Sequence, residues 1–191
     1  MAMSAALGVV LSVITALVLR PTAALPAAIV FTVVSCIVVA VDLARRDISR
    51  RALGLAVAVV ILAQGFGALS VDQPARLLGA LAGGVVAFLA VMTFHLVSPE
   101  SPTRDEVVYA ALVGTTLGWF GLDRVGLGLG LGLVIGAVSA GPQVLVGRRR
   151  AGDDVVDRPV TATFAPAMAL GGWIALCWGE SILSWYSSSQ V

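Results

Sequence analysis

Long apolar runs separated by short polar stretches dominate the chain. Six runs are close to the roughly 20 apolar residues that a bilayer-spanning helix needs, and a seventh is shorter. They cover residues 2–19, 23–41, 53–71, 77–97, 106–121 (the short run), 124–146 and 163–184. Prolines, charges and turn-forming residues lie between them, as in loops. The pattern predicts an all-α polytopic membrane protein with six to seven transmembrane helices, built as a single domain over residues 1–191.

The composition supports a membrane location. Of the 191 residues, 59% are hydrophobic and 12% are charged, whereas soluble domains are usually about 45–50% apolar and about 25% charged. The first run lacks a positively charged start, so we expect a retained helix and not a signal peptide. Because the net charge is only +1, we expect the lipid bilayer, and no nucleic acid, as a partner.

Arginine placement predicts the orientation, because cytoplasmic loops are enriched in basic residues. If the loop after the second run is cytoplasmic and all seven runs span, nine of the twelve arginines are cytoplasmic and three are not. The nine are Arg45, Arg46, Arg50, Arg51, Arg104, Arg148, Arg149, Arg150 and Arg158. If the 106–121 run did not span, residues 148–150 would lie outside, which the same rule disfavours. We therefore expect a multi-pass protein of the cell (plasma) membrane.

Three acidic residues at the predicted cytoplasmic boundary are the candidate site. Asp42 ends the second run, and the pair Asp105 and Glu106 opens the short run. Two close carboxylates that share one proton can activate water and protonate a leaving amine, with no metal and no cofactor. We expect a cytoplasmic-facing di-carboxylate cleft of this kind. The alternative is that Asp105 and Glu106 only cap the start of their helix.

The remaining reactive side chains are expected to be structural. Cys36 and Cys177 lie inside apolar runs, and two isolated cysteines cannot form a four-thiolate zinc site. His95 is the single histidine, which excludes a His-rich metal site; it is expected to pack near the end of its run. Glu180 is expected to snorkel or to pair with Arg124.

Glycines of the 124–146 run form two ridges at helical spacing. Gly126 and Gly130 form one ridge, and Gly128, Gly132 and Gly136 form the other. Small residues four apart let membrane helices approach closely. We expect tight helix packing here and not a phosphate-binding loop.

The region around Asp42 resembles the first motif of the type IV prepilin peptidases and preflagellin peptidases. That motif is an Asp, usually a hydrophobe, four variable residues, and then Ile-Pro-Asn or Ile-Pro-Asp. Asp42 and Ile48 keep the spacing, with Ser49 in place of proline and Arg50 in place of the polar residue. The resemblance implies that Asp42 is one of two catalytic acids.

A second, degenerate motif follows in the chain. The family pattern is Gly-x-Gly-Asp, then Val-Lys-Leu and a small-residue helix that ends in glycine. Residues 103–114 fit this frame without a gap, with Asp105 at the second glycine, Glu106 at the catalytic aspartate and Val108 at the common lysine. Either Glu106 or Asp105 is then the second acid.

A third segment, Thr163 to Gly172, is similar to the Pro-Phe-Gly-Pro-x-x-x-Leu-Gly segment of the family. Larger bacterial members carry a cysteine-containing N-terminal part with N-methyltransferase activity, so this chain looks like the short, peptidase-only form. The resemblance implies a membrane aspartic endopeptidase. Its substrates would be type IV pilin-like precursors of the tight-adherence (Flp/Tad) type, from which it would remove a basic leader peptide at the cytoplasmic face.

Two other functions stay open. A catalytically degenerate homologue would serve as a pilus-assembly scaffold or binding partner, because both motif glycines are missing. A small transporter is less favoured, because no acid or base lies at mid-membrane in a pair of broken helices, the usual sign of such a site.

Overall fold

A computed structural model describes residues 2–19, 22–43, 50–97, 103–150 and 164–189, with side chains for 8–19, 22–41, 51–97, 103–139 and 164–189. Seven helices make up these residues, and the described ranges contain no strand. They are α1 (Ala2–Leu19), α2 (Leu25–Leu43), α3 (Arg50–Ser70), α4 (Pro74–Val97), α5 (Arg104–Gly118), α6 (Leu122–Arg150) and α7 (Ala165–Ser188). The all-helical prediction is confirmed.

Within the described residues, four helices are long and apolar enough to cross a membrane. The four stretches are Arg51–Ser70, Pro74–Val97, Leu122–Ser139 and Ala165–Ser188. The parts of α1 and α2 whose side chains are described, Gly8–Leu19 and Leu25–Val41, are apolar but shorter. This set of helices is that of a polytopic membrane protein; the count of six to seven spans and the single-domain organisation stay predictions.

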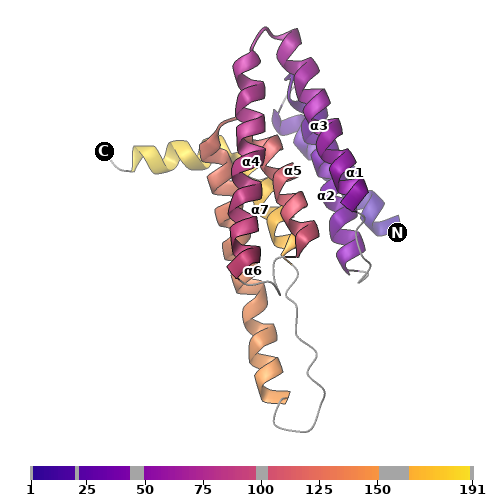
Figure 1. The fold of residues 1–191 in the computed structure, drawn as a ribbon, viewed down its shortest axis with the longest axis vertical. Coiled ribbons are helices and arrows are strands. Elements are labelled where there is room, and N and C mark those ends of the chain that lie inside the picture. Colours follow the sequence, from indigo (N-terminus) through magenta and orange to yellow (C-terminus); the bar gives the residue numbers. More distant parts are fainter. Residues whose placement is uncertain (1, 20–21, 44–49, 98–102, 151–163, 190–191) are drawn as a thin grey trace.

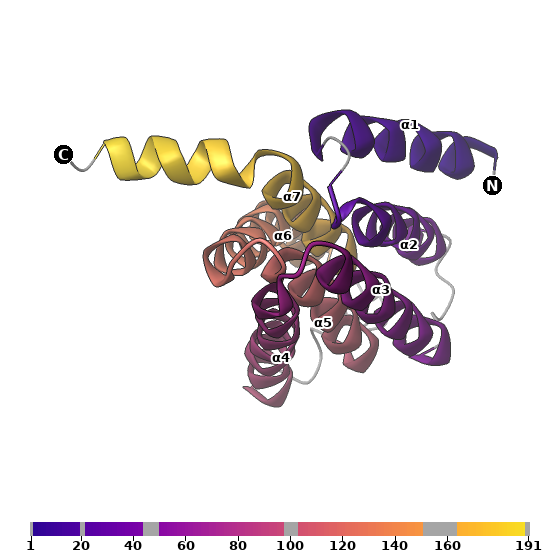
Figure 2. The same ribbon diagram turned by 90° about the horizontal axis from the view of Figure 1, so that it is seen from above.

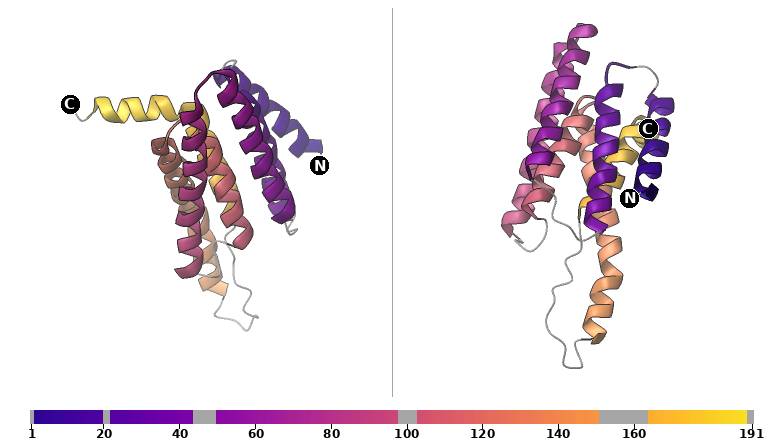
Figure 3. Two further views of the ribbon diagram at one scale, coloured as in Figure 1. Left: turned by 45° about the horizontal axis from the view of Figure 1, so that its top comes forward. Right: turned by 90° about the vertical axis from the view of Figure 1, so that its right-hand side faces the viewer.

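Successive helices alternate in direction along the bundle (Figure 1). As a result α2, α4 and α6 end, and α3, α5 and α7 begin, at one end of the bundle, beyond which α6 extends (Figure 3). We call this the acidic end, because the backbone of Asp42 lies there in the last turn of α2, and Asp105 and Glu106 lie there in the first turn of α5. The opposite end carries the α3–α4 and α5–α6 connections.

The short helix α5 occupies the centre of the bundle. It packs against α2, α3, α4, α6 and α7 (Figure 2), and 11 of its 15 residues are buried. It approaches α4 most closely, because a β-carbon on Gly83 would lie 2.5 Å from the carbonyl oxygen of Gly114. Other helices therefore cover most of the surface of α5.

Only one of the two predicted glycine ridges on α6 packs closely. Gly128 and Gly132 lie against α7, where a β-carbon on Gly132 would be 3.1 Å from the Cα of Met168. Gly126 and Gly130 have nothing within 4 Å among the described residues. The prediction was wrong for that second ridge, because it lies on the side of α6 turned away from α7.

The C-terminal part of α7 leaves the bundle, and its last turns run outward from the other helices (Figures 1 and 2). Trp185 and Tyr186 on this part are exposed. The candidate acids are at the other end of the bundle, so this arm takes no part in their arrangement.

Candidate functional site

A buried hydrogen bond fixes the register between the two helices that carry the candidate acids. The Tyr109 hydroxyl on α5 donates to the Ser35 hydroxyl on α2 over 2.7 Å. Tyr109 is 1% exposed and Ser35 is 6% exposed. Because α2 and α5 run in opposite directions, the residues after Ser35 and those before Tyr109 approach the same end of the bundle.

Helix geometry then sets the depth of each acid relative to this bond. Asp42 follows Ser35 by seven residues, about 10 Å along α2, and Asp105 precedes Tyr109 by four, about 6 Å along α5. Asp42 and the start of α5 therefore lie at similar depth at the acidic end. The side chain of Asp42 lies outside the described residues, so the convergence of the carboxyl groups stays a prediction.

Glu106 lies in the first turn of α5, and backbone N–H groups surround its carboxylate. Its Oε2 accepts a hydrogen bond of 2.6 Å from the Thr103 N–H, and the Thr103 hydroxyl accepts one of 3.4 Å from the Glu106 N–H. This reciprocal pair is a capping box, which satisfies donors that the first turn of a helix leaves unpaired. The predicted capping of α5 is confirmed for Glu106.

The same carboxylate also holds the start of α7. Its Oε1 accepts hydrogen bonds from the Phe164 N–H at 2.6 Å and the Ala165 N–H at 2.9 Å. Phe164 is the N-cap of α7 and makes no side-chain cap of its own. Glu106 is thus the cap of two helices at once, and the positive ends of both helix dipoles favour a carboxylate there.

Asp105 and His95 are two further ionisable residues at the acidic end. Asp105 is half-buried, one residue before Glu106, and His95 is half-buried in the last turn of α4. Each of the two has an interaction partner. Of the three acids predicted to meet at this end, the structure describes the side chains of Asp105 and Glu106.

Comparison with known proteins relates the chain to a family of peptidases. It is 32% identical over 113 residues to the prepilin leader peptidase/N-methyltransferase of Aeromonas salmonicida, in strain A449 and in a second sequence of that species. The same enzyme of Aeromonas hydrophila is 32% identical over 110 residues. The chain is a relative of the prepilin leader peptidases.

These matches cover 59%, 59% and 57% of this chain and 35%, 35% and 34% of the respective relatives. The chain thus spans about a third of the length of these prepilin peptidases. No family model matches the chain, and no solved structure matches it. The relationship to prepilin peptidases, predicted from the motifs around Asp42 and Glu106, is confirmed.

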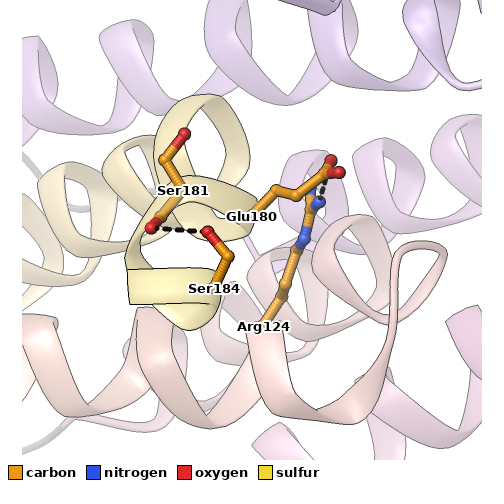
Figure 4. Close-up of polar contacts among 4 residues, drawn as sticks. All are labelled: Arg124, Glu180, Ser181 and Ser184. Atoms are coloured by element: carbon orange, nitrogen blue, oxygen red, sulfur yellow. Dashed lines mark hydrogen bonds and ion pairs between the residues drawn. The ribbon is translucent and has the colours of Figure 1, made fainter. Parts of the chain in front are cut away.

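At the end of the bundle away from these acids, Glu180 pairs with Arg124, as predicted. The Arg124 Nη2 lies 3.1 Å from the Glu180 Oε2 (Figure 4), and the Arg124 guanidinium lies 4.9 Å from the centre of the Phe120 ring. Glu180 is 88% exposed. The pair therefore links α6 to α7 and is remote from Asp105 and Glu106.

Two polar residues that the sequence did not single out make buried hydrogen bonds to other helices that hold α5 in place. Tyr109 is one, and Gln64 of α3 is the other, because its Nε2 donates a 3.0 Å hydrogen bond to the Thr115 carbonyl near the end of α5. A buried amide in an apolar run indicates an interhelical hydrogen bond, but it does not identify the partner.

Cys36 and Cys177 are free, and the described residues hold no group of three or more metal-ligating side chains.

Proposed function

We propose that the protein is a membrane aspartic endopeptidase, of the cell membrane, that removes the basic leader peptide from type IV pilin-like (Flp/Tad-type) precursors at the cytoplasmic face. The relationship to prepilin leader peptidases supports the substrate class. The observation that carries the proposal is the register of α2 and α5 around the Ser35–Tyr109 hydrogen bond, which is consistent with Asp42 and the acids of α5 meeting at one end.

The reaction needs two carboxyl groups that hold one proton between them. The ionised carboxylate takes a proton from water, whose oxygen attacks the carbonyl carbon of the scissile amide. The protonated carboxyl gives its proton to the amide nitrogen as the C–N bond breaks. Asp42 supplies one group and Asp105 or Glu106 supplies the other. These groups balance the protons of hydrolysis by themselves.

Co-expression with a pilin-like precursor tests the proposal. The precursor should lose mass with the unaltered chain and should stay uncut with Asp42→Asn. Asp72→Asn is the matched control, because Asp72 is exposed, lies at the other end of the bundle and has a φ of 51° that asparagine also tolerates. Cleavage that survives Asp42→Asn, or that stops with Asp72→Asn, would contradict the proposal.

A scaffold that binds precursors without cutting them is the second candidate. The hydrogen bonds to Glu106 favour it, because they occupy the carboxylate that the family motif would use for catalysis. In the same experiment, a scaffold would co-purify with the intact precursor and produce no shortened product. Unaltered binding by Asp42→Asn together with no cleavage by any variant would support this function.

A further inference from the structure

We propose that Asp105 is the second catalytic acid and that Glu106 is a positioning residue, which holds Asp105 through the first turn of α5. The inference rests on the proposed peptidase function and assigns roles within its site. It departs from the motif alignment, which puts Glu106 at the catalytic aspartate.

The hydrogen bonds of Glu106 leave little of its carboxylate for a hydrolytic water. A carboxylate accepts about four hydrogen bonds. Glu106 uses one on the Thr103 N–H and two on the N–H groups of Phe164 and Ala165. The residue is only 7% exposed. A general base must keep an oxygen within hydrogen-bond reach of its water, and here both oxygens are already bonded to backbone.

The burial of these partners makes the arrangement costly to lose. The first N–H groups of a helix have no partner within the helix, and the bond from Ala165 to Glu106 is buried. If Glu106 turned toward a water, the N–H groups of Phe164 and Ala165 would lose their acceptor. Phe164 makes no side-chain cap that could replace it. Glu106 therefore stays with the two helix ends.

Asp105 and Glu106 lie on different sides of α5, nearer to α2 and to α7 respectively. At about 100° per residue, Asp105 lies about 40° to one side of Tyr109 and Glu106 about 60° to the other. The Tyr109 side is the face that contacts α2, and the Glu106 side contacts the start of α7. Asp105 is thus closer to the direction of α2, which carries Asp42, and it is half-buried at the acidic end.

Glu106→Asp distinguishes a positioning role of Glu106 from a catalytic role, because the two roles predict different changes in kcat. Glu106→Asp moves the carboxylate back by one methylene, about 1.5 Å, so it cannot hold Thr103 and α7 together. We expect kcat to fall about 10- to 100-fold with KM within about twofold, since misplacement of about 1 Å can cost about 100-fold. If Glu106 were the catalytic acid, Glu106→Asp would restore the family motif, and kcat would stay the same or rise.

The measurement uses the purified full chain in detergent micelles with a pilin-like precursor. Rates are taken per folded molecule, below the unfolding midpoint of each variant, so that a purely structural role leaves kcat unchanged. Asp105→Asn should lower kcat by at least about 1,000-fold. Glu106→Gln should keep measurable cleavage, because the amide oxygen still accepts from α7.

Each outcome has a distinct meaning. Loss of all cleavage with Glu106→Gln, together with near-normal kcat for Asp105→Asn, would overturn the inference and leave the peptidase function intact. Unchanged kcat for folded Glu106→Asp would also overturn it. No cleavage by the unaltered chain, or full cleavage by Asp42→Asn, would overturn the proposed function and the inference together.

Discussion

The hydroxyl of Tyr109 donates a 2.7 Å hydrogen bond to the hydroxyl of Ser35, although the two residues are 74 positions apart in the chain. The bond joins α5, the central helix, to α2, and both residues are buried. It lies about one helical turn from Asp105 and about two from Asp42. The bond therefore helps to set the two acid-bearing helices relative to each other.

Removal of this bond should weaken both stability and cleavage. Tyr109→Phe should lower the free energy of unfolding by about 0.6 kcal/mol and at most about 1.7 kcal/mol, the range for side-chain hydrogen bonds between membrane helices. Thermal unfolding in detergent measures the change, with exposed Tyr186→Phe as the control. In a double-mutant cycle with Ser35→Ala, additive losses would show that the hydroxyls are not coupled.

Alanine substitution should destabilise the protein at a glycine inside the α6–α7 contact and should be tolerated at a glycine of α6 outside it. A β-carbon on Gly171 would lie 2.6 Å from the Gly128 carbonyl oxygen, so Gly171→Ala must push backbones apart and should cost about 1–3 kcal/mol. Gly130→Ala meets no described atom within 4 Å and should be neutral or slightly stabilising. Unfolding midpoints test this; equal effects of the two variants would refute the close contact.

Loss of the Arg124–Glu180 pair should depend on which partner is changed. Glu180 is 88% exposed, so Glu180→Gln should change stability by less than about 1 kcal/mol. Arg124→Ala should cost more, because the side chain packs beside Gly179 and over the Phe120 ring and would lose that packing as well as the charge. A larger loss with Glu180→Gln than with Arg124→Ala, in the same unfolding assay, would contradict this account.

The buried amide of Gln64 should tolerate an apolar side chain of similar size. Its Nε2 bonds the Thr115 carbonyl, while its Oε1 has no partner among the described residues. Gln64→Met removes a hydrogen bond worth about 0.5–1.5 kcal/mol and also removes the similar cost of the unpaired oxygen. We expect a change below about 1 kcal/mol, against about 2–5 kcal/mol for the cavity left by Gln64→Ala. Comparable losses for both variants would show that the hydrogen bond dominates.

Much of the secondary structure, and one cap, could be predicted from local sequence. Apolar runs near bilayer length predict helices because lipid offers no partner for backbone groups, and all seven appear close to their predicted limits. The Thr103–Glu106 spacing is a capping-box signature, so the capping of α5 by Glu106 could also be predicted. For Glu180 the sequence left two alternatives, snorkelling or pairing with Arg124, and the structure shows the pair.

By itself the sequence determined where the chain is apolar, where it turns and which acids stand at the ends of helices, because these follow from neighbours a few residues apart. Only the tertiary structure decided that Glu106 also caps α7, that α5 is buried at the centre, and that one glycine ridge packs while the other does not. Each of these depends on contacts between residues far apart in the chain: 36 positions separate Gly132 from Met168, and 58 separate Glu106 from Phe164. Helical periodicity defines the faces of a helix, but the packing of the whole bundle chooses their partners.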